Sequence, residues 1–339
     1  MGRQEIVFGG FVDRLDFDKS IIELEKKIEE LKKMTESKAI DFSDEILKLE
    51  IKAEKMRKEI YEKLTPWQRQ QVARHMQRPR TLDYVGRIFE DFTPLSGDRL
   101  FKDDPAIIGG PAMFEGRPVM IIGTQKGKDT KDSIHRNFGM PNPEGYRKAL
   151  RLVNMAAKFG WPVISFIDTA GAFPGLGAEE RGQAEAIAKN LRDFSTAETQ
   201  IIIVVHGEGG SGGAIGIGVG DKVLMLENAV YSVISPEGCA AILWKDSSKA
   251  SNAADVIKMT AHDLLELGVI DEIIKEPSGG AHRNYDKTAA EIKAALKRNL
   301  AEIKPLELHD LLERRYQKFR NMGKFLEITA EAAGAGKAG

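Results

Sequence analysis

Hydrophobic residues near the start of the chain recur at helical spacing. Between residues 19 and 64 they stand three or four positions apart, with Glu and Lys between them, which puts the apolar side chains on one face. The pattern predicts two amphipathic helices, broken near residues 35–41 and folded back as an antiparallel hairpin. The apolar stripe is expected to dock on the chain's own domain or on a partner subunit. Its members are Ile21, Leu24, Ile28 and Leu31, then Phe42, Ile46, Leu49, Ala53, Met56, Ile60 and Leu64.

From Arg117 onward, short apolar runs alternate with amphipathic segments. Runs such as Ile201–Val205 are typical of strands buried on both faces, and their alternation with helices predicts an α/β fold with a largely parallel sheet. Two further helices, broken at Pro305, are expected over 285–319. The other predicted strands cover 118–122, 162–167, 222–226 and 230–233, and the other helices cover 144–158, 179–194, 236–244 and 250–267.

Net charge, cysteine content and the length of the apolar runs limit the kinds of partner and site that this protein can have. The net charge of −1 over 339 residues gives no general attraction to nucleic acid or to an anionic membrane. A single cysteine, Cys239, excludes an internal disulfide and a cysteine-based zinc site within this chain. No apolar run approaches the roughly 20 residues that span a bilayer, and the first residues lack the apolar core of a signal peptide. A cytoplasmic protein without a membrane partner is expected.

The segment 69–80, RQQVARHMQRPR, is locally basic. Its charge is confined to this stretch, and few aromatic residues are interleaved with the basic ones, so direct nucleic-acid binding is not expected. The interpretation is a basic surface for a phosphate-bearing ligand or an acidic partner.

The densest signal is a glycine-rich stretch that follows the strand 201–205. Eight of the fifteen residues from His206 to Gly220 are glycine. Glycine costs backbone entropy, so such a cluster indicates positive φ, close backbone approach, or N–H groups that face a ligand. The stretch predicts a site for an anion or a developing oxyanion.

Three motifs overlap in this stretch, and the stretch alone leaves all three open. Gly207, Gly209 and Gly212 match the dinucleotide fingerprint, whereas G-x-S-x-G around Ser211 matches a hydrolase nucleophile elbow. The third interpretation is an oxyanion hole without a nucleophile. Context disfavours the first, because the glycines come after at least two strand–helix units. It also disfavours the second, because no later histidine stands in a convincing catalytic loop.

Eight segments, taken together and in order, resemble the carboxyltransferase α subunit of bacterial-type, multisubunit acetyl-CoA carboxylase. The resemblance runs from the N-terminal helices to about Met322. It implies a crotonase-like (ClpP/crotonase) fold of repeated ββα units. The expected division is a hairpin and linker over 1–85, a carboxyltransferase domain over 86–322, and a disordered tail over 323–339. The segments are Gly123–Gly127, Arg136–Met140, Pro143–Ala149, Asp168–Gly175, Gly177–Gln183, Gly207–Ala214, Ser232–Gly238 and Gly279–Arg283.

The resemblance also implies an activity and partners. Family members move the carboxyl group from carboxybiotin on the biotin carboxyl carrier protein to acetyl-CoA, giving malonyl-CoA, the first committed step of fatty acid synthesis. They do so with a zinc-containing β subunit in an α2β2 assembly, alongside biotin carboxylase, and no metal is expected in this chain. The alternatives are a single-chain crotonase-like acyl-CoA hydrolase or hydratase, or an interaction protein built on the hairpin.

The resemblance assigns candidate site residues as well. Gly212 and Gly213 are expected to form the oxyanion hole with their backbone N–H groups and to serve the ureido oxygen of biotin. The competing interpretation is that Gly209 and Gly210 line the hole while the other pair admits helix packing. The candidates for binding biotin or substrate are Gly209, Gly210, Ala172, Phe173 and Gly175, with Phe173 as a wall for the biotin rings.

A basic loop supplies candidates for the phosphates of CoA, namely Lys126, Lys128 and Arg136. A solvated loop or a contact with the β subunit is the competing interpretation. One departure from the family pattern stands nearby. Ala170 occupies the position where the family usually has proline, which removes a fixed φ from that loop.

Overall fold

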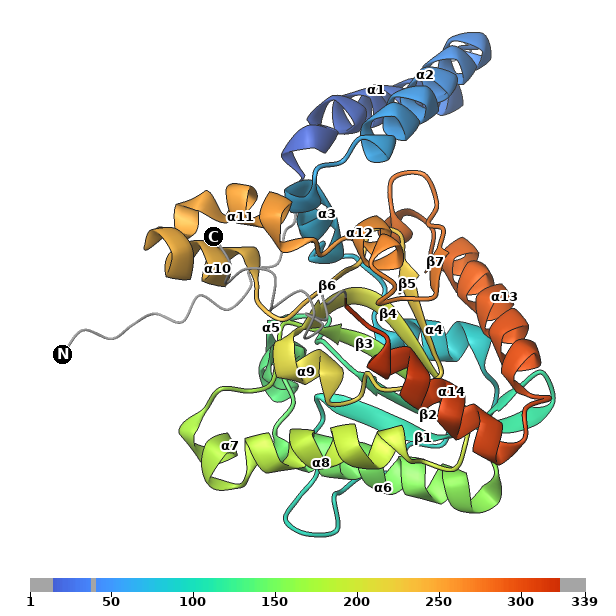
Figure 1. Ribbon diagram of the computed structural model, residues 1–339. Helices are drawn as coiled ribbons and strands as arrows, with labels where there is room; N and C mark the ends of the chain where they lie inside the picture. Colours follow the sequence, from blue (N-terminus) through green and yellow to red (C-terminus); the bar gives the residue numbers. More distant parts are fainter. Residues whose placement is uncertain (1–14, 38–40, 324–339) are drawn as a thin grey trace, which may run out of the picture.

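One mixed β-sheet forms the centre of the molecule (Figure 1). The computed structural model describes residues 15–37 and 41–323, and within them seven strands belong to this sheet. They are β1 (Ile107–Phe114), β2 (Arg117–Thr124), β3 (Val163–Thr169), β4 (Ile201–Gly210), β5 (Lys222–Leu226), β6 (Val230–Ser232) and β7 (Glu272–Ile274). The order is β1-β2-β3-β4-β5-β7, with β6 paired to the end of β4. Strands β1 and β2 are antiparallel and the other pairs are parallel, so β2, β3 and β4 end at one edge.

Helices cover both faces of the sheet. A Cβ on Gly109 would meet Leu152 of α6, whereas a Cβ on Gly123 would meet Thr81 of α4. Gly109 is paired with Ile122, and successive side chains of a strand point to opposite faces, so α6 and α4 lie on opposite sides. The helices of the body are α3 (Pro66–Ala73), α4 (Thr81–Ile88), α5 (Thr130–His135), α6 (Pro143–Phe159), α7 (Leu176–Glu180), α8 (Gln183–Ser195), α9 (Ser211–Ile215), α10 (Pro236–Trp244), α11 (Ala250–Ile257), α12 (Ala261–Glu266), α13 (Tyr285–Ile303) and α14 (Leu308–Arg320).

The predicted α/β class is confirmed, but the sequence pattern does not predict β1 or the three-residue β7. Strand β1 contains Gly109, Gly110 and Pro111, which are poor strand formers. A Cβ on Gly110 would lie 1.9 Å from the carbonyl oxygen of Thr93. Glycine is therefore required here by a close backbone contact, which the hydrophobic pattern does not predict.

Two segments predicted as single helices are each divided. The segment 179–194 is split between α7 and α8, where Gly182 takes a φ of +83°. The segment 250–267 is split between α11 and α12 at Lys258, with φ of +56°. Thr260 then caps α12 by accepting a hydrogen bond from a backbone N–H of its first turn. Local cap chemistry therefore overrides the continuous apolar periodicity.

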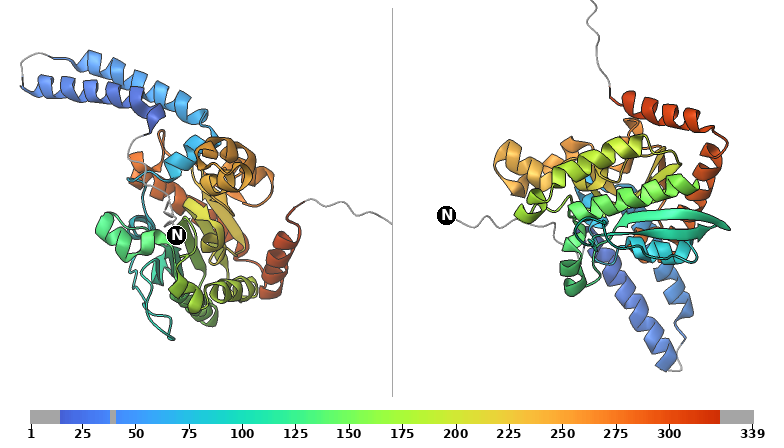
Figure 2. Two further views of the ribbon diagram at one scale, coloured as in Figure 1. Left: turned by 90° about the vertical axis from the view of Figure 1, so that its left-hand side faces the viewer. Right: turned by 90° about the horizontal axis from the view of Figure 1, so that it is seen from below.

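The predicted N-terminal hairpin is present as α1 (Lys19–Ser37) and α2 (Ser43–Glu62), which project from the body (Figures 1 and 2). Its apolar stripes pack on each other, with Ile28, Ile46 and Ala53 at the centre. The expectation that the stripe docks on the body or on a partner is therefore wrong for these residues. Across a hairpin, two facing stripes bury each other.

Polar contacts join the base of the hairpin to the body. Tyr61 donates a hydrogen bond to Asp18 over 2.9 Å, which ties α2 to the turn before α1. Arg283, from the loop before α13, lies 2.9 Å from Glu25 of α1, and Glu25 also accepts a hydrogen bond from Arg57. These contacts fix where the hairpin leaves the body.

The segment after the hairpin belongs to the body. Helix α3 packs against β4, β6 and α11, and α4 packs against β3 and α13, although the predicted first domain extends to residue 85. Of the predicted tail 323–339, all but Gly323 lies outside the described residues. In the part of the chain that the structure describes, no helix is both long and apolar enough to cross a membrane.

The prediction of a basic surface over residues 69–80 is wrong. Four arginines of this segment are buried, with exposed fractions of 3–9%. Arg78 lies 2.6 Å from Glu276, and Arg69 donates to the side chain of Asn228 over 2.7 Å. The arginines of this segment therefore pair with groups inside the protein and do not form a basic surface. The buried arginines are Arg69, Arg74, Arg78 and Arg80.

The packing of the hairpin predicts different effects at two adjacent positions of α2. Ile46 is 9% exposed in the hairpin core, whereas Leu47 is 56% exposed. Ile46→Asp should destabilise the hairpin by about 1–3 kcal/mol, because a carboxylate is placed among apolar side chains. Leu47→Asp should cost only the lost helix propensity, roughly 0.5 kcal/mol or less, since its side chain is already exposed. Urea unfolding monitored by circular dichroism measures both, and equal effects would contradict the packing described.

Candidate functional site

The glycine-rich turn joins β4 directly to the short helix α9. Ser211 takes a left-handed φ of +49°, and the N–H groups of Gly212 and Gly213 have no acceptor among residues 15–37 and 41–323. The first N–H groups of a helix have no partner within that helix. Gly209 and Gly210 instead belong to β4, where they are in register with β6. The geometry therefore favours Gly212 and Gly213 as the free pair of donors.

The turn touches the loop after β3 with the two backbones in direct contact. A Cβ on Gly210 would lie 2.2 Å from the carbonyl oxygen of Ala170, and a Cβ on Gly213 would lie 2.3 Å from the carbonyl carbon of Gly171. A Cβ on Gly212 would meet the tip of an α8 side chain at 3.3 Å. Packing therefore requires glycine at positions 210 and 213, and less strictly at position 212.

The loop after β3 is closed by a side chain. The Thr169 hydroxyl donates to the carbonyl of Gly171 over 2.8 Å and accepts from the N–H of the same residue over 3.1 Å. Ala170, between these two residues, is exposed. The threonine provides a local restraint on a loop that lacks the fixed φ of proline.

Beneath this pair of loops lies a buried ionic cluster. The Lys126 ammonium lies 2.7 Å from Asp168 Oδ1 and 2.8 Å from Glu208 Oε2. The three side chains extend from the carboxyl ends of β2, β3 and β4, and each is less than a tenth exposed. Burial alone would raise the pKa of Asp168, but the charge of Lys126 outweighs it and lowers this pKa to about 2. The lysine therefore links three strand ends through full charges.

The cluster extends to α3 and α10. Glu208 Oε1 accepts hydrogen bonds from Arg74 Nε over 2.7 Å and from Gln70 Nε2 over 3.0 Å. Arg74 also pairs with Glu237 in the first turn of α10. The hydrophobic pattern of the sequence does not predict this cluster. The available signal was the pair of acidic residues at the ends of two apolar strand runs, together with arginines in the helix before them.

His206 lies next to the cluster in the centre of the fold. It is fully buried, its Nε2 lies 3.0 Å from Thr81 Oγ1, and its carbonyl accepts a hydrogen bond from Arg78 over 2.7 Å. Burial lowers the pKa of His206 to about 4; Asp168 opposes this shift, and Arg78 and Lys126 add to it. The imidazole is therefore neutral at physiological pH.

The predicted cations of the basic loop occupy different environments. Lys126 is buried between two carboxylates, so its position does not favour the role predicted for it at a CoA phosphate. Lys128 is exposed and lies 2.8 Å from Asp83. Arg136 lies 2.8 Å from Asp132 and donates to a backbone carbonyl. Lys128 and Arg136 stay candidates near the surface.

The predicted binding residues lie on the loop that contacts the turn. The backbone N of Ala172 would lie 2.7 Å from a Cβ on Gly213, so Ala172 adjoins the free donors. The Phe173 ring covers Gly175, where a Cβ would lie 2.4 Å from the ring. Phe173 and Arg181 both line a polar pocket of about 380 Å³. The structure thus brings Ala172 to the donors and directs Phe173 toward an adjacent pocket.

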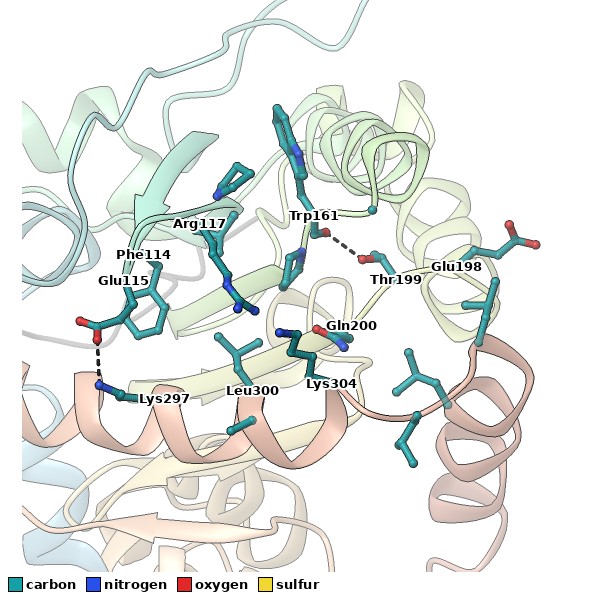
Figure 3. A pocket seen from close by; sticks show the side chains of 18 residues that line it. Phe114, Glu115, Arg117, Trp161, Glu198, Thr199, Gln200, Lys297, Leu300 and Lys304 are labelled. Carbon is teal, nitrogen blue, oxygen red and sulfur yellow. Dashed lines mark hydrogen bonds and ion pairs between the residues drawn. The ribbon is translucent and has the colours of Figure 1, made fainter.

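A separate groove lies at the opposite edge of the sheet (Figure 3). It has a volume of about 680 Å³ and lies between α13, α14 and the turn from β1 to β2. Trp161 and Gln200, which line it, come just before the first residues of β3 and β4. The groove is therefore at the amino ends of the strands, away from the glycine-rich turn.

Comparisons with known proteins decide the family. A model described as "Acetyl co-enzyme A carboxylase carboxyltransferase-like" matches residues 14–323. The chain belongs to this family. It is 58% identical over 314 residues to the acetyl-coenzyme A carboxylase carboxyl transferase subunit alpha of Geobacter metallireducens, covering 93% of this chain and 98% of that protein. The protein of the same name from Anoxybacillus flavithermus is 58% identical over 313 residues, covering 92% and 96%.

Solved structures show the same crotonase-like fold at low sequence identity. A transcarboxylase 12S structure has a TM-score of 0.54 at 17% identity, covering 73% of this chain and 43% of that one. A Pseudomonas malonate decarboxylase hetero-dimer gives a TM-score of 0.53 at 18% identity, covering 64% and 89%. Membership of the carboxyltransferase family favours an α subunit over the alternative of a single-chain acyl-CoA hydrolase or hydratase.

In this carboxyltransferase subunit, the burial of His206 predicts a specific pH dependence. The pKa is about 4 in the folded state and near 6.5 in the unfolded state, so folding disfavours the protonated ring. The stabilising contribution is complete above pH 6.5 and is lost as the pH falls from 6.5 to 4. A single such group changes the free energy of unfolding by up to about 1.4 kcal/mol per pH unit.

Replacing the ring removes that contribution. In His206→Gln, the free energy of unfolding should depend less steeply on pH between 6.5 and 5, by about the slope of one proton. Chemical denaturation at a series of pH values measures this slope. An identical slope in the wild type and the variant would show that His206 does not have the depressed pKa.

Proposed function

We propose that this chain is the α half of an acetyl-CoA carboxyltransferase. With a β subunit, it moves the carboxyl group from carboxybiotin on a carrier protein to acetyl-CoA, giving malonyl-CoA. The observation that carries the proposal is the pair of free N–H groups at Gly212 and Gly213, beside a loop with which they are in backbone contact. Two such donors stabilise an oxygen that gains negative charge.

The residues present suit biotin. Its ureido oxygen needs neutral donors, and the backbone N–H groups of Gly212 and Gly213 would supply them. A side chain on Gly213 would displace the neighbouring loop, so the close fit depends on its absence. Carboxybiotin, when bound, supplies the carboxyl group. Ala172 adjoins the donors and would border the bound group, and Phe173 and Gly175 continue the same loop.

The chain by itself has little acid–base chemistry at this turn. Lys126 and Glu208 are paired with each other, and His206 is neutral and buried. The structure does not favour Ser211 as a hydrolase nucleophile. The nearest histidine in sequence, His206, is paired with Thr81 and not with Ser211. The other groups needed at acetyl-CoA would therefore come from a β subunit.

An apolar surface near the site suits such a partner. Helix α10 exposes large hydrophobic side chains, and its first turn carries Glu237, which contacts Arg74 of the buried cluster. Exposed apolar patches of this kind mark interfaces. The exposed side chains of this patch are Val233, Ile242, Leu243, Trp244 and Val256.

The remaining partners follow from the same proposal. The β subunit carries zinc and forms an α2β2 assembly with this chain in the cytoplasm. A biotin carboxylase loads the carrier protein. Lys128 and Arg136 meet the phosphates of CoA, and Lys126 is left out because it is buried.

Co-expression with a zinc-containing carboxyltransferase β subunit tests the proposal. The purified complex should form malonyl-CoA from carboxybiotin and acetyl-CoA, and the isolated chain should not turn over acyl-CoA thioesters. A stable complex without transfer would contradict the proposed function. Turnover by the isolated chain would favour a single-chain crotonase-like enzyme.

Two substitutions in the turn separate an oxyanion hole from a nucleophile. Gly213→Val should lower transfer on the order of 100- to 1,000-fold, because its side chain would enter the loop at Gly171 and disturb the donors. Ser211→Ala should change the rate little, since the hydroxyl takes no part. Both are assayed in the assembled complex, with assembly checked by size-exclusion chromatography. The reverse pattern would restore the interpretation as a nucleophile elbow.

A further inference from the structure

Strand β4 contains extra residues where it passes the end of β3. The paired positions run from Ile167 and Val205 to Thr169 and Gly209, so a step of two residues in β3 faces a step of four in β4. Such a bulge interrupts the ladder, and other contacts must fix the bulged strand. The extra residues lie immediately before the glycine-rich turn.

Side chains of the ionic cluster supply those contacts. The Glu208 N–H donates to Asp168 Oδ1 over 3.0 Å, so a carboxylate takes the place of a backbone acceptor. Lys126 then bridges the carboxylates of the same two residues. A Cβ on Gly207 would lie 2.3 Å from that Asp168 oxygen, so the bulge is shaped around the carboxylate.

The four most buried side chains of the cluster are balanced in charge, and Glu237, which also pairs with Arg74, is 30% exposed. Lys126 and Arg74 face Asp168 and Glu208, and each of the four side chains is at most 8% exposed. Burial disfavours every charge, but the opposite charges outweigh it: the pKa of Lys126 is raised, and the pKa values of both carboxyls are lowered. Charges held in low dielectric allow little displacement.

We propose that Lys126, Asp168, Glu208 and Arg74 are positioning residues that set the spacing between the loop after β3 and the glycine-rich turn. Asp168 stands two residues before Ala170, and Glu208 stands one residue before Gly209. The cluster thereby aims the N–H groups of the Gly212–Gly213 pair without touching the ligand. The chemistry at those donors rests on the proposed function, whereas the spacing of the loops does not.

A buried ionic cluster can also stabilise the fold without positioning the loops. Variants that differ in the net charge of the cluster distinguish positioning from stabilisation. Lys126→Met leaves one net negative charge in the cluster and should lower the melting temperature, because an unpaired buried charge is costly. Lys126→Met combined with Asp168→Asn restores neutrality and leaves Glu208 paired with Arg74, but it does not restore the bridge. The double variant should therefore recover most of the melting temperature while the loops stay displaced.

A second buried ion pair provides the matched control. Asp221 lies 2.8 Å from the fully buried Arg315 and accepts a hydrogen bond from the N–H of Ile201, at the amino end of β4. Asp221→Asn breaks a buried ion pair that contacts the opposite end of β4, far from the glycine-rich turn. It should lower the melting temperature without altering the loops.

Amide hydrogen exchange on the full chain, measured at temperatures equally far below each melting point, reads out the loops directly. In the double variant, exchange over residues 169–175 and 208–213 should accelerate by about tenfold or more, and Asp221→Asn should leave both segments at the wild-type rate. Wild-type exchange in the double variant, or equal acceleration in Asp221→Asn, would overturn the proposal. Glu208→Gln alone, which leaves the Lys126–Asp168 pair in place, gives the same test if the lysine variants do not fold.

Transfer by the complex with the β subunit provides a second readout. The double variant should lose on the order of 100-fold in transfer rate with its melting temperature restored. Recovery of transfer together with stability would mean that the cluster is only structural. A wild-type complex without transfer would instead count against the proposed function, and the exchange measurement would still decide the positioning role.

Discussion

The contact on which the site depends is the Lys126 ammonium held between Asp168 and Glu208. It joins the carboxyl ends of three parallel strands at the edge where α/β sheets place their chemistry. Removing three charged side chains from water is costly, so the arrangement is stable only with near-complete pairing. Arg74 completes that pairing and brings α3 against the same edge. The glycine-rich turn and the loop after β3 both begin at this fixed point.

Backbone contact above the cluster explains the composition of the turn. Glycine occupies the positions where the two loops meet without room for a Cβ. At the start of α9, the N–H groups of Gly212 and Gly213 have no acceptor in the described part of the chain. In the proposed function the turn is half of a site: its N–H groups stabilise an oxyanion, but it brings few proton donors or acceptors. The exposed apolar surface of α10, connected through Glu237 to Arg74, is consistent with a partner that completes the site.

Much of this organisation is visible in the sequence, because it follows from local patterns. The hairpin, the strands from β2 to β6 and the glycine-rich turn all have periodic or compositional signatures. The cluster has a weaker signature, acidic residues at the ends of two strand runs, because Lys126, Asp168 and Glu208 lie about 40 residues apart and meet only through strand order. For the same reason the arginines of residues 69–80 suggest a basic surface when they are in fact buried. Strand β1 is not predicted from the sequence, because its glycines are required by tertiary contacts and not by a local pattern.

The most direct test of this account is a crystal structure of the complex of this chain with its β subunit and biotin. The account predicts that the ureido oxygen lies within hydrogen-bond distance of the N–H groups of Gly212 and Gly213. It also predicts that Lys126 still bridges Asp168 and Glu208. A ureido oxygen held by other groups, or a Lys126 that turns from the carboxylates to the ligand, would contradict the account.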